Sequence, residues 1–197
     1  MDKIALVAGG TGLVGNLLLR ELVQCSDYRE VKAVVRRGSR IDIPGVTTIE
    51  IDFDLLGRSD KELIADVVFC CLGTTIKKAK TKEQFYKVDF TYPYLLAQTA
   101  RVNQCRQFHL ISSIGANVKS LFYYSRVKGE IEQAISALKI PAIHIFRPSL
   151  LIGERQEKRA GEKVGVALSK LFGPAMVGSM RRYRGIEAQT VATAMVH

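Results

Sequence analysis

Short apolar runs alternate with helical patterns along most of the sequence. The runs are rich in Val, Ile and Ala, and between them apolar residues recur at three- and four-residue steps. Strands are expected at residues 3–8, 31–36, 46–51, 65–71, 107–112 and 142–146. Helices are expected at residues 13–25, 81–104 and 121–139. Near-continuous apolar strands separated by helices predict a parallel sheet covered on both faces, the doubly wound α/β architecture of the Rossmann fold.

The long helical stretch at 81–104 contains residues that signal where a helix starts or breaks. Thr81 and Gln84 have capping-box spacing, which predicts a helix start at Thr81. Pro93 lies inside the stretch and must kink or restart the helix, because proline has no N–H to donate. Thr91 is then a candidate for a second N-cap.

The domain organisation follows from the length. The 197 residues are 47% hydrophobic, enough for one sizeable core and too few for two ordinary domains. We therefore expect a single domain over residues 1–197, with about 150–197 forming a C-terminal substrate or lid region. Within it, residues 164–172 read as a short amphipathic helix that covers the cleft or contacts a partner.

The termini and cysteines point to a soluble cytoplasmic protein without a membrane span or a metal site. The first apolar run comes almost at once, with no charged leader or signal sequence before it, and no apolar stretch approaches ~20 residues. The four cysteines form no C-x-x-C pair, and the histidines are too sparse to complete a metal site. The vicinal Cys70 and Cys71 end an apolar run, which favours a buried reduced pair over redox chemistry.

The net charge of +10 raises the question of nucleic acid. Basic residues cluster at 36–40, 77–82, 154–159 and 181–184, but no nucleic-acid-binding motif accompanies them. Loops of this kind also attract anionic small molecules, phosphates above all. We therefore expect no specific nucleic-acid partner.

A glycine-rich segment, GGTGLVG, follows the first strand directly and opens the first helix. Gly9, Gly12 and Gly15 permit a tight turn, close approach of backbone to a pyrophosphate, and close packing of helix on strand. The helix N-terminus then offers free N–H groups to phosphate. The alternative is a tight turn without ligand, but the strand-loop-helix context favours a dinucleotide site.

Two arginines stand where NAD-binding domains usually carry an acidic residue, about twenty residues beyond the glycine segment. Arg36 and Arg37 end the second strand. Guanidinium groups pair with a 2′-phosphate, which a carboxylate would repel. A solvated basic turn is the alternative reading, and we favour NADP, as NADPH, over NAD.

Tyr124 and Lys128 lie four residues apart in the helix expected at 121–139. With Tyr124 at zero, Lys128 falls at about 40° on the helical wheel, beside the apolar stripe. The stripe consists of Val127, Ile131, Ile135 and Leu138. A lysine that only aids solubility would lie on the other side with Arg126 and Glu130, so Lys128 is expected to face inward.

A buried lysine beside a phenol stabilises the phenolate and lowers the pKa of the tyrosine. Such a phenol can donate a proton to a carbonyl oxygen or take one from an alcohol. The fifth strand ends in two serines, and alternation allows only one to face the same crevice. Ser113 is our choice and Ser112 the reserve. The alternatives are a surface tyrosine with a snorkelling lysine, and serines that cap the following turn.

These motifs resemble those of the short-chain dehydrogenase/reductases. More narrowly, GGTGLVGNLLLREL, VVRR, DVVFCCLGTT, HLISSIGAN, YYSRVKGEIE and FRPSLLIGERQEKR resemble the Tat-interacting-protein type, an atypical branch of that superfamily. The resemblance implies a Rossmann fold that binds NADPH, with Tyr124 as acid/base, Lys128 on the nicotinamide ribose and Ser113 on the substrate oxygen. It further implies that Thr11, Gly12, Leu13 and Val14 hold the pyrophosphate. Leu72 and Gly73 are then expected to border the adenosine side, and Leu151 and Arg159 to close the site.

Two features depart from the superfamily pattern. Many members carry an asparagine after the fourth strand as part of a proton relay, and the matching stretch here offers Asp89. The C-terminal region, in which related enzymes build a substrate pocket, is short. The leading hypothesis is an NADPH-dependent oxidoreductase acting on a small carbonyl or alcohol. The second is an NADP(H)-binding regulatory or redox-sensing protein that acts through a protein partner or a second copy of itself.

Overall fold

The computed structural model describes residues 2–56, 61–153 and 178–197. Its centre is a parallel sheet of six strands in the order β3-β2-β1-β4-β5-β6. The strands are β1 (Lys3–Ala8), β2 (Tyr28–Arg36), β3 (Val46–Ile51), β4 (Val67–Cys70), β5 (Gln107–Ile111) and β6 (Ala142–Phe146). All six expected strands are present, and the predicted doubly wound α/β fold is confirmed.

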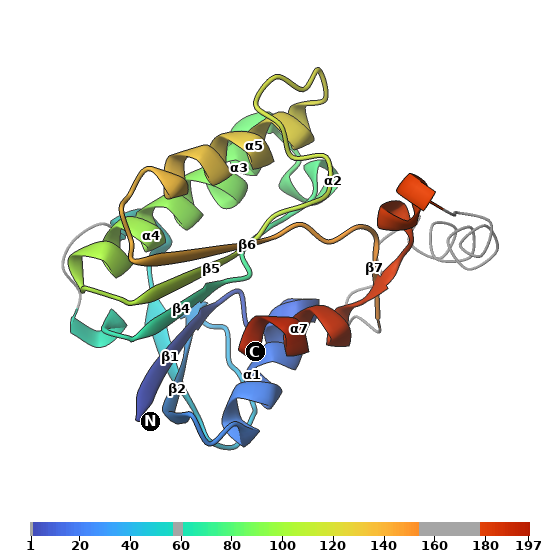
Figure 1. Ribbon diagram of the computed structural model, residues 1–197. Helices are drawn as coiled ribbons and strands as arrows, with labels where there is room; N and C mark the ends of the chain where they lie inside the picture. The colour runs from blue at the N-terminus through green and yellow to red at the C-terminus, as the bar shows by residue number, and fades with distance from the viewer. Residues whose placement is uncertain (1, 57–60, 154–177) are drawn as a thin grey trace.

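Helices cover both faces of the sheet (Figure 1). Helix α1 (Leu13–Gln24) and helix α7 (Ala188–Val196) lie on one face, and α4 (Tyr92–Val102) and α5 (Tyr123–Ser136) lie on the other. Shorter helical segments occupy the connections. They are η1 (Phe53–Leu55), η2 (Lys61–Leu63), α2 (Ile76–Ala79), α3 (Lys82–Tyr86) and η5 (Gly178–Tyr183).

Strand alternation divides the core into two clusters, one on each face. On the α4–α5 face, Leu6 and Ala8 of β1 pack with Ile131 and Ile135 of α5. On the opposite face, Ala5 and Val7 pack with residues of α1 and α7. Because both faces of β1 are fully buried, this strand has no polar side chain after Lys3, which explains the near-continuous apolar run in the sequence.

The expected helix at 81–104 is present over residues 82–102, but the type of helix changes within it. Its predicted start is confirmed, since the hydroxyl of Thr81 accepts the N–H of Gln84 at 3.2 Å. A π-helical turn, η3 (Lys87–Thr91), then separates α3 from α4, and Pro93 lies in the first turn of α4. The prediction of Thr91 as an N-cap is wrong. Thr91 has helical dihedrals (φ −62, ψ −51), so the chain never leaves the helical conformation and no free N-terminus needs a cap.

The register brings the carboxyl ends of the central strands together. Ala8, the last residue of β1, pairs with Val34 of β2 on one side and with Cys70 of β4 on the other. Cys70 in turn pairs with Leu110 of β5. The segments that follow these strands therefore meet at one edge, where the strand order reverses between β1 and β4.

The C-terminal part contributes elements that the sequence did not indicate. Strands β7 (Leu151–Ile152) and β8 (Ile186–Glu187) form a small parallel pair, with the N–H of Ile186 donating to the carbonyl of Leu150 at 2.9 Å. Helix α7 then packs on α1 through Ala188, Val191, Ala192 and Met195. Within the described ranges, no helix is both long and apolar enough to cross a membrane.

A buried histidine on strand β5 gives a testable pH dependence. His109 of β5 lies against Phe69, with ring centroids 4.6 Å apart, and stacks on His144 at 4.5 Å. Burial, and secondly the neighbouring His144, lower the pKa of His109 to about 4. Between pH 6.5 and 4 the unfolded chain therefore binds a proton that the native protein excludes, so stability falls as the pH falls through this window.

We expect the free energy of unfolding to be about 2 kcal/mol lower at pH 5 than at pH 7 from His109 alone. His109→Phe, which keeps an aromatic ring against Phe69, should remove most of that difference. Urea unfolding of both proteins at the two pH values measures it. Equal pH dependence in both proteins would show that His109 is not the titrating group.

Candidate functional site

The glycine segment forms a tight turn that connects β1 to α1 and packs against the backbone that follows β4. Gly9 has φ +87, and a Cβ there would lie 2.5 Å from the carbonyl oxygen of Cys71. Gly15, in the first turn of α1, packs so closely on Gly9 that a Cβ would overlap the Gly9 carbonyl. The N–H of Gly12 donates to that carbonyl at 2.9 Å and closes the turn. Side chains at Gly9 and Gly15 are therefore excluded by the fold itself.

The N-terminus of α1 remains open to an anion. No side chain caps the helix at Gly12, and its first turn holds no acidic residue. Thr11 is exposed beside this end, whereas the side chain of Val14 is buried in the core and leaves only its backbone for a ligand. Leu13 packs on Gly153, where a Cβ would lie 3.0 Å from the nearer methyl of Leu13. The free N–H groups and the helix dipole together suit a phosphate.

Arg36 and Arg37 are exposed at the carboxyl end of β2. The turn that follows folds back over the glycine segment, since a Cβ on Gly10 would lie 3.2 Å from the side chain of Ile41. Within the described parts of the chain, neither guanidinium is paired with a carboxylate. The two side chains are thus available at the end of the site that the sequence assigned to the 2′-phosphate.

Leu72 and Gly73 follow β4 and connect the two ends of the site. The backbone N–H of Leu72 is at the glycine segment, where a Cβ on Gly9 would lie 2.9 Å from it. Gly73 lies farther along, and a Cβ there would be 3.4 Å from Asp89 Oδ1 and 3.7 Å from Lys128 Nζ. Gly73 is therefore next to the expected reactive lysine. The family resemblance implied that Gly73 borders the adenosine side, which stays a prediction.

Lys128 lies on the inner face of α5, as the helical wheel predicts. Its residue exposure is 4%, next to fully buried Ile131 and Val127. Its Nζ lies 2.8 Å from Oδ1 of Asp89, which is itself 1% exposed. The remaining oxygen of Asp89 accepts the N–H of Thr74 at 2.8 Å. This buried ion pair joins α5, the π-helical turn η3 and the segment after β4.

Tyr124 stands at the mouth of the site, 36% exposed, with its ring 5.7 Å from the buried ring of Phe85. The neighbouring Tyr123 is committed elsewhere, because its hydroxyl donates to the carbonyl of Lys82 at 3.0 Å. Among the described residues, the hydroxyl of Tyr124 makes no hydrogen bond. Of the two adjacent tyrosines, only Tyr124 has a hydroxyl available to a ligand.

The electrostatics keep Lys128 charged. Burial by itself would lower the pKa of Lys128, but attraction to Asp89 and then to Tyr124 outweighs burial, and the pKa is raised. Cys70 of β4 also faces the lysine. Burial raises the pKa of that thiol to about 12, so it is neutral near pH 7. The local charges are therefore one ammonium and one carboxylate.

The two serines after β5 are both buried, Ser113 at 9% and Ser112 at 4% exposure. The hydroxyl of Ser113 donates to the carbonyl of Ile114 at 3.2 Å. The hydroxyl of Ser112 has no hydrogen-bond partner among the described residues. The preference for Ser113 over Ser112 therefore stays a prediction.

The remaining predicted site residues belong to the C-terminal region. Leu151 is half-buried in β7, where it packs on the α1–α7 side of the core. Arg159 and the helix expected at 164–172 lie outside the described residues.

Sequence reasoning noted Asp89 only as a departure and missed its ion pair with Lys128. It also missed Gly129, where a Cβ would overlap the backbone of Asn117 and Val118. Gly129 lets the loop before α5 pack on the helix, where the N–H of Asn117 donates to the carbonyl of Ser125 at 3.0 Å. A glycine inside a predicted helix, which costs about 1 kcal/mol relative to alanine, was the available signal for this close contact.

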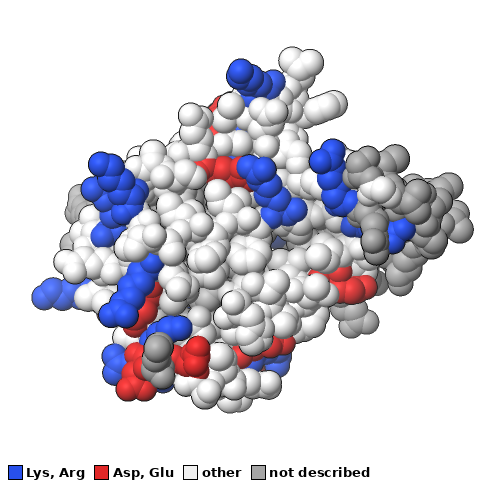
Figure 2. Space-filling view, viewed as in Figure 1, with Lys and Arg blue, Asp and Glu red and all other residues white. Residues whose placement is uncertain are grey.

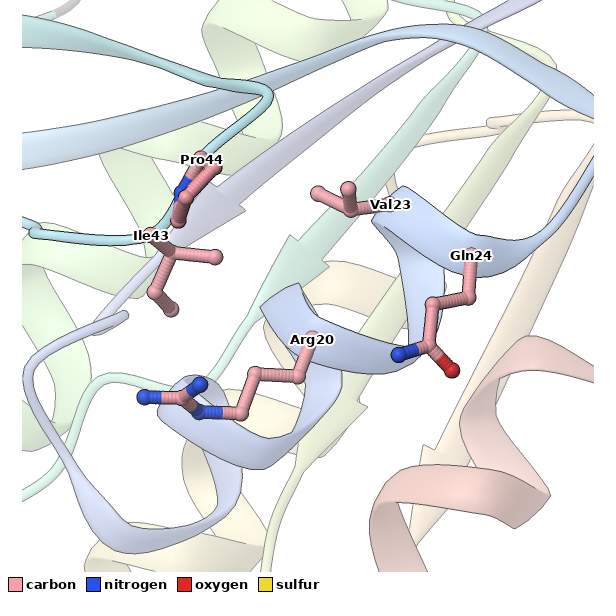
Figure 3. A pocket seen from close by; sticks show the side chains of 5 residues that line it. All are labelled: Arg20, Val23, Gln24, Ile43 and Pro44. Atoms are coloured by element: carbon pink, nitrogen blue, oxygen red, sulfur yellow. The ribbon is translucent and has the colours of Figure 1, made fainter.

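Other surface features do not compete with this edge of the sheet. A pocket near the C-terminal end of α1 contains none of the predicted site residues (Figure 3). It is lined by Arg20, Val23, Gln24, Ile43 and Pro44. On the face seen in Figure 2, basic side chains lie in separate groups with acidic ones among them, and no continuous basic stripe is present there.

The amino-acid sequence is similar to those of known proteins. The model of the NAD dependent epimerase/dehydratase family matches residues 5–171. Protein HTATIP2 of Rattus norvegicus is 32% identical over all of this chain and 81% of its own length. The mitochondrial protein FMP52 of Eremothecium gossypii is 36% identical over 85% of this chain and 75% of its own length. The resemblance to the Tat-interacting-protein type is thus confirmed.

The fold also matches solved structures. The Bordetella bronchiseptica enzyme WbmH, crystallised in complex with NAD+, superposes with a TM-score of 0.71 at 15% identity. That match covers 100% of this chain and 72% of the WbmH chain. At this level of identity, the similarity establishes the fold alone.

Proposed function

The chain belongs to the NAD dependent epimerase/dehydratase family, and from this premise we propose that it is an NADP(H)-dependent oxidoreductase acting on a small carbonyl or alcohol. The observation that carries the proposal is the charged Lys128, buried beside Tyr124 at the edge of the sheet where the glycine segment also lies. A lysine that only aided solubility would not be buried at 4% exposure.

The residues present fit a dinucleotide. The turn at Gly9 and Gly15 leaves no room for a Cβ, so a pyrophosphate meets only backbone there, and the uncapped start of α1 offers N–H groups. In the proposal, Thr11, Gly12, Leu13 and Val14 hold the pyrophosphate. Arg36 and Arg37 hold a 2′-phosphate, which favours NADP(H) over NAD(H). Leu72, Gly73, Leu151 and Arg159 line the remainder.

When bound, the nicotinamide supplies or accepts the hydride, and the chain moves the proton. Tyr124 donates its hydroxyl proton to the carbonyl oxygen during reduction, or takes a proton from the alcohol in reverse. Lys128 binds the nicotinamide ribose hydroxyls and stabilises negative charge on the Tyr124 oxygen. Ser113, with Ser112 as the alternative, donates a hydrogen bond to the same substrate oxygen.

The test is NADPH oxidation by the purified protein against a panel of aldehydes, ketones and quinones, with NADPH affinity measured separately by fluorescence. The proposal expects tight binding and turnover of at least one class. Tight binding without turnover on the whole panel would contradict the enzyme proposal.

That outcome would favour a second candidate, a regulatory protein whose NADP(H) state governs a protein partner. Exposed apolar side chains next to the site favour this candidate. Leu121 is 95% and Phe122 79% exposed, in a loop held by hydrogen bonds of its own. The N–H of Phe122 donates to the Ser120 hydroxyl at 3.2 Å, and Arg126 donates to the Ser120 carbonyl at 2.9 Å.

The cytoplasm is the compartment we propose. Cys25, Cys70, Cys71 and Cys105 are all free thiols, which suits a reducing environment. The fungal relatives are named mitochondrial, which makes that compartment the alternative. Cell fractionation distinguishes the two.

A further inference from the structure

The described residues shield the ion pair of Lys128 and Asp89 almost completely from bulk water. The side chains of Lys128 and Asp89 are 5% and 1% exposed, and their charged atoms are 2.8 Å apart. The second oxygen of Asp89 is occupied by the N–H of Thr74. A Cβ on Gly73 would lie 3.4 Å from Asp89 Oδ1 and 3.7 Å from Lys128 Nζ, so the segment after β4 passes close to the pair on that side. Asp89 is thus held by one contact at each of its two carboxylate oxygens.

The π-helical turn η3 positions the carboxylate. Such a turn inserts an extra residue into a helix, which shifts the face that the following residues present. Asp89 is the buried residue of this turn, between α3 and α4, and it points at α5. The local irregularity therefore serves a specific contact between the predicted reactive helix and the segment after β4.

We propose that Asp89 balances the charge of Lys128, so that the ammonium favours loss of the Tyr124 hydroxyl proton less strongly and the site suits proton donation, in the direction of carbonyl reduction. This inference rests on the proposed function for its direction, but its electrostatic part concerns the protein alone. An unbalanced ammonium would favour loss of the proton from the Tyr124 hydroxyl. A carboxylate in direct contact with that ammonium opposes this effect.

The ionisable groups that act on the lysine come from three elements. They are Asp89 on η3, Tyr124 on α5 itself and Cys70 on β4. Cys70 is neutral near pH 7, because burial raises its pKa to about 12. Asp89 therefore provides the negative charge that sets the balance.

The test measures phenolate formation at Tyr124 directly, without cofactor or substrate. The ultraviolet absorbance of phenolate is followed against pH, and the curve of the matching Tyr124→Phe protein is subtracted to remove the other tyrosines. In Asp89→Asn the site gains one positive charge, and phenolate should form at a pH lower by on the order of one unit. In Lys128→Met the site gains one negative charge, and phenolate should form at higher pH.

The double variant Asp89→Asn with Lys128→Met restores a neutral site. Its phenolate should form near the wild-type pH, and replacing both charges together avoids leaving one buried ion unpaired. This keeps the test decisive if either single variant fails to fold. Equal titration in wild type and the single variant that folds, or a double variant far from wild type, would overturn the proposal.

Glu132→Gln is the matched control. Like Asp89, Glu132 is a buried carboxylate, with its side chain 7% exposed. It lies on α5, and its partner is Arg147, which follows β6. Its loss should lower stability without moving the titration of Tyr124. A merely structural role for Asp89 predicts that Asp89→Asn behaves in the same way.

Activity then separates this inference from the proposed function. If the wild type is active, Asp89→Asn should shift the pH profile of alcohol oxidation to lower pH and reduce carbonyl reduction several-fold at pH 7. If the wild type reduces nothing but the titration shifts as expected, the enzyme proposal fails and the charge balance by Asp89 stands.

Discussion

Tyr124→Phe should lower any carbonyl-reducing activity by about 10²–10⁴-fold, the usual contribution of general-acid catalysis. The substitution removes one hydroxyl from a residue that is 36% exposed. That hydroxyl makes no hydrogen bond among the residues that the structure describes. The fold and the affinity for NADPH should therefore stay close to those of the wild type. Initial rates of NADPH oxidation, with affinity measured separately by fluorescence titration, test both parts.

Tyr123→Phe is the control for this prediction, since it removes the same group from the adjacent residue. The Tyr123 hydroxyl donates to the Lys82 carbonyl, so its loss should cost about 0.5–1.5 kcal/mol of stability and leave the rate unchanged. The helical wheel places Arg126 on the outer side of α5, which would suggest Arg126→Ala as a control, but that change would also disturb the structure. Arg126 holds the loop before α5 through the Ser120 carbonyl. An active wild type with a fully active Tyr124→Phe would make the tyrosine structural.

Replacing both Arg36 and Arg37 by alanine should remove the preference for NADPH over NADH. Hydrogen bonds to a charged group contribute about 1.5–3 kcal/mol each, so the loss of NADPH affinity should be about 10- to 150-fold for each arginine. NADH lacks the 2′-phosphate and should bind nearly as before. Titration of both cofactors against both proteins measures the effect.

Arg40→Ala, in the same exposed turn, should change neither affinity by a comparable amount and controls for general loss of positive charge. Equal affinities of the wild type for NADPH and NADH would sink the assignment of Arg36 and Arg37. A wild type that prefers NADH would reverse it.

Much of the fold follows from local sequence because strand burial is strong here. Residues 3–8 form β1 with the bounds that the apolar run predicts, since both faces of this central strand are covered. The cap at Thr81 was equally readable, because a cap depends only on a side chain and an N–H three residues away.

The features that the sequence did not predict depend on contacts between residues that lie far apart in the chain. The π-helical turn at 87–91 carries Asp89, which pairs with Lys128, and no local propensity indicates either the turn or the pair. Helix α7 was not predicted because it has 9 residues, and two of its four buried residues are alanines. Val191 and Met195, at helical spacing, were the readable signal.

The position of Lys128 on the inner side of α5 was predictable from the helical wheel, since Val127 and Ile131 define the buried stripe around it. Its partner was not predictable, because a carboxylate in an apolar segment has many candidate roles. The choice between Ser112 and Ser113 depends on the chain path after β5 has ended, where strand alternation no longer applies.

A crystal structure of the protein grown with NADPH tests the central claim most directly. The account predicts the pyrophosphate on the turn at Gly9–Gly15 and a nicotinamide ribose hydroxyl within about 3 Å of Lys128 Nζ. It also predicts that the Tyr124 hydroxyl faces the reactive side of the nicotinamide ring. A nucleotide whose nicotinamide lies away from Tyr124 and Lys128, or no nucleotide at saturating concentration, would contradict it.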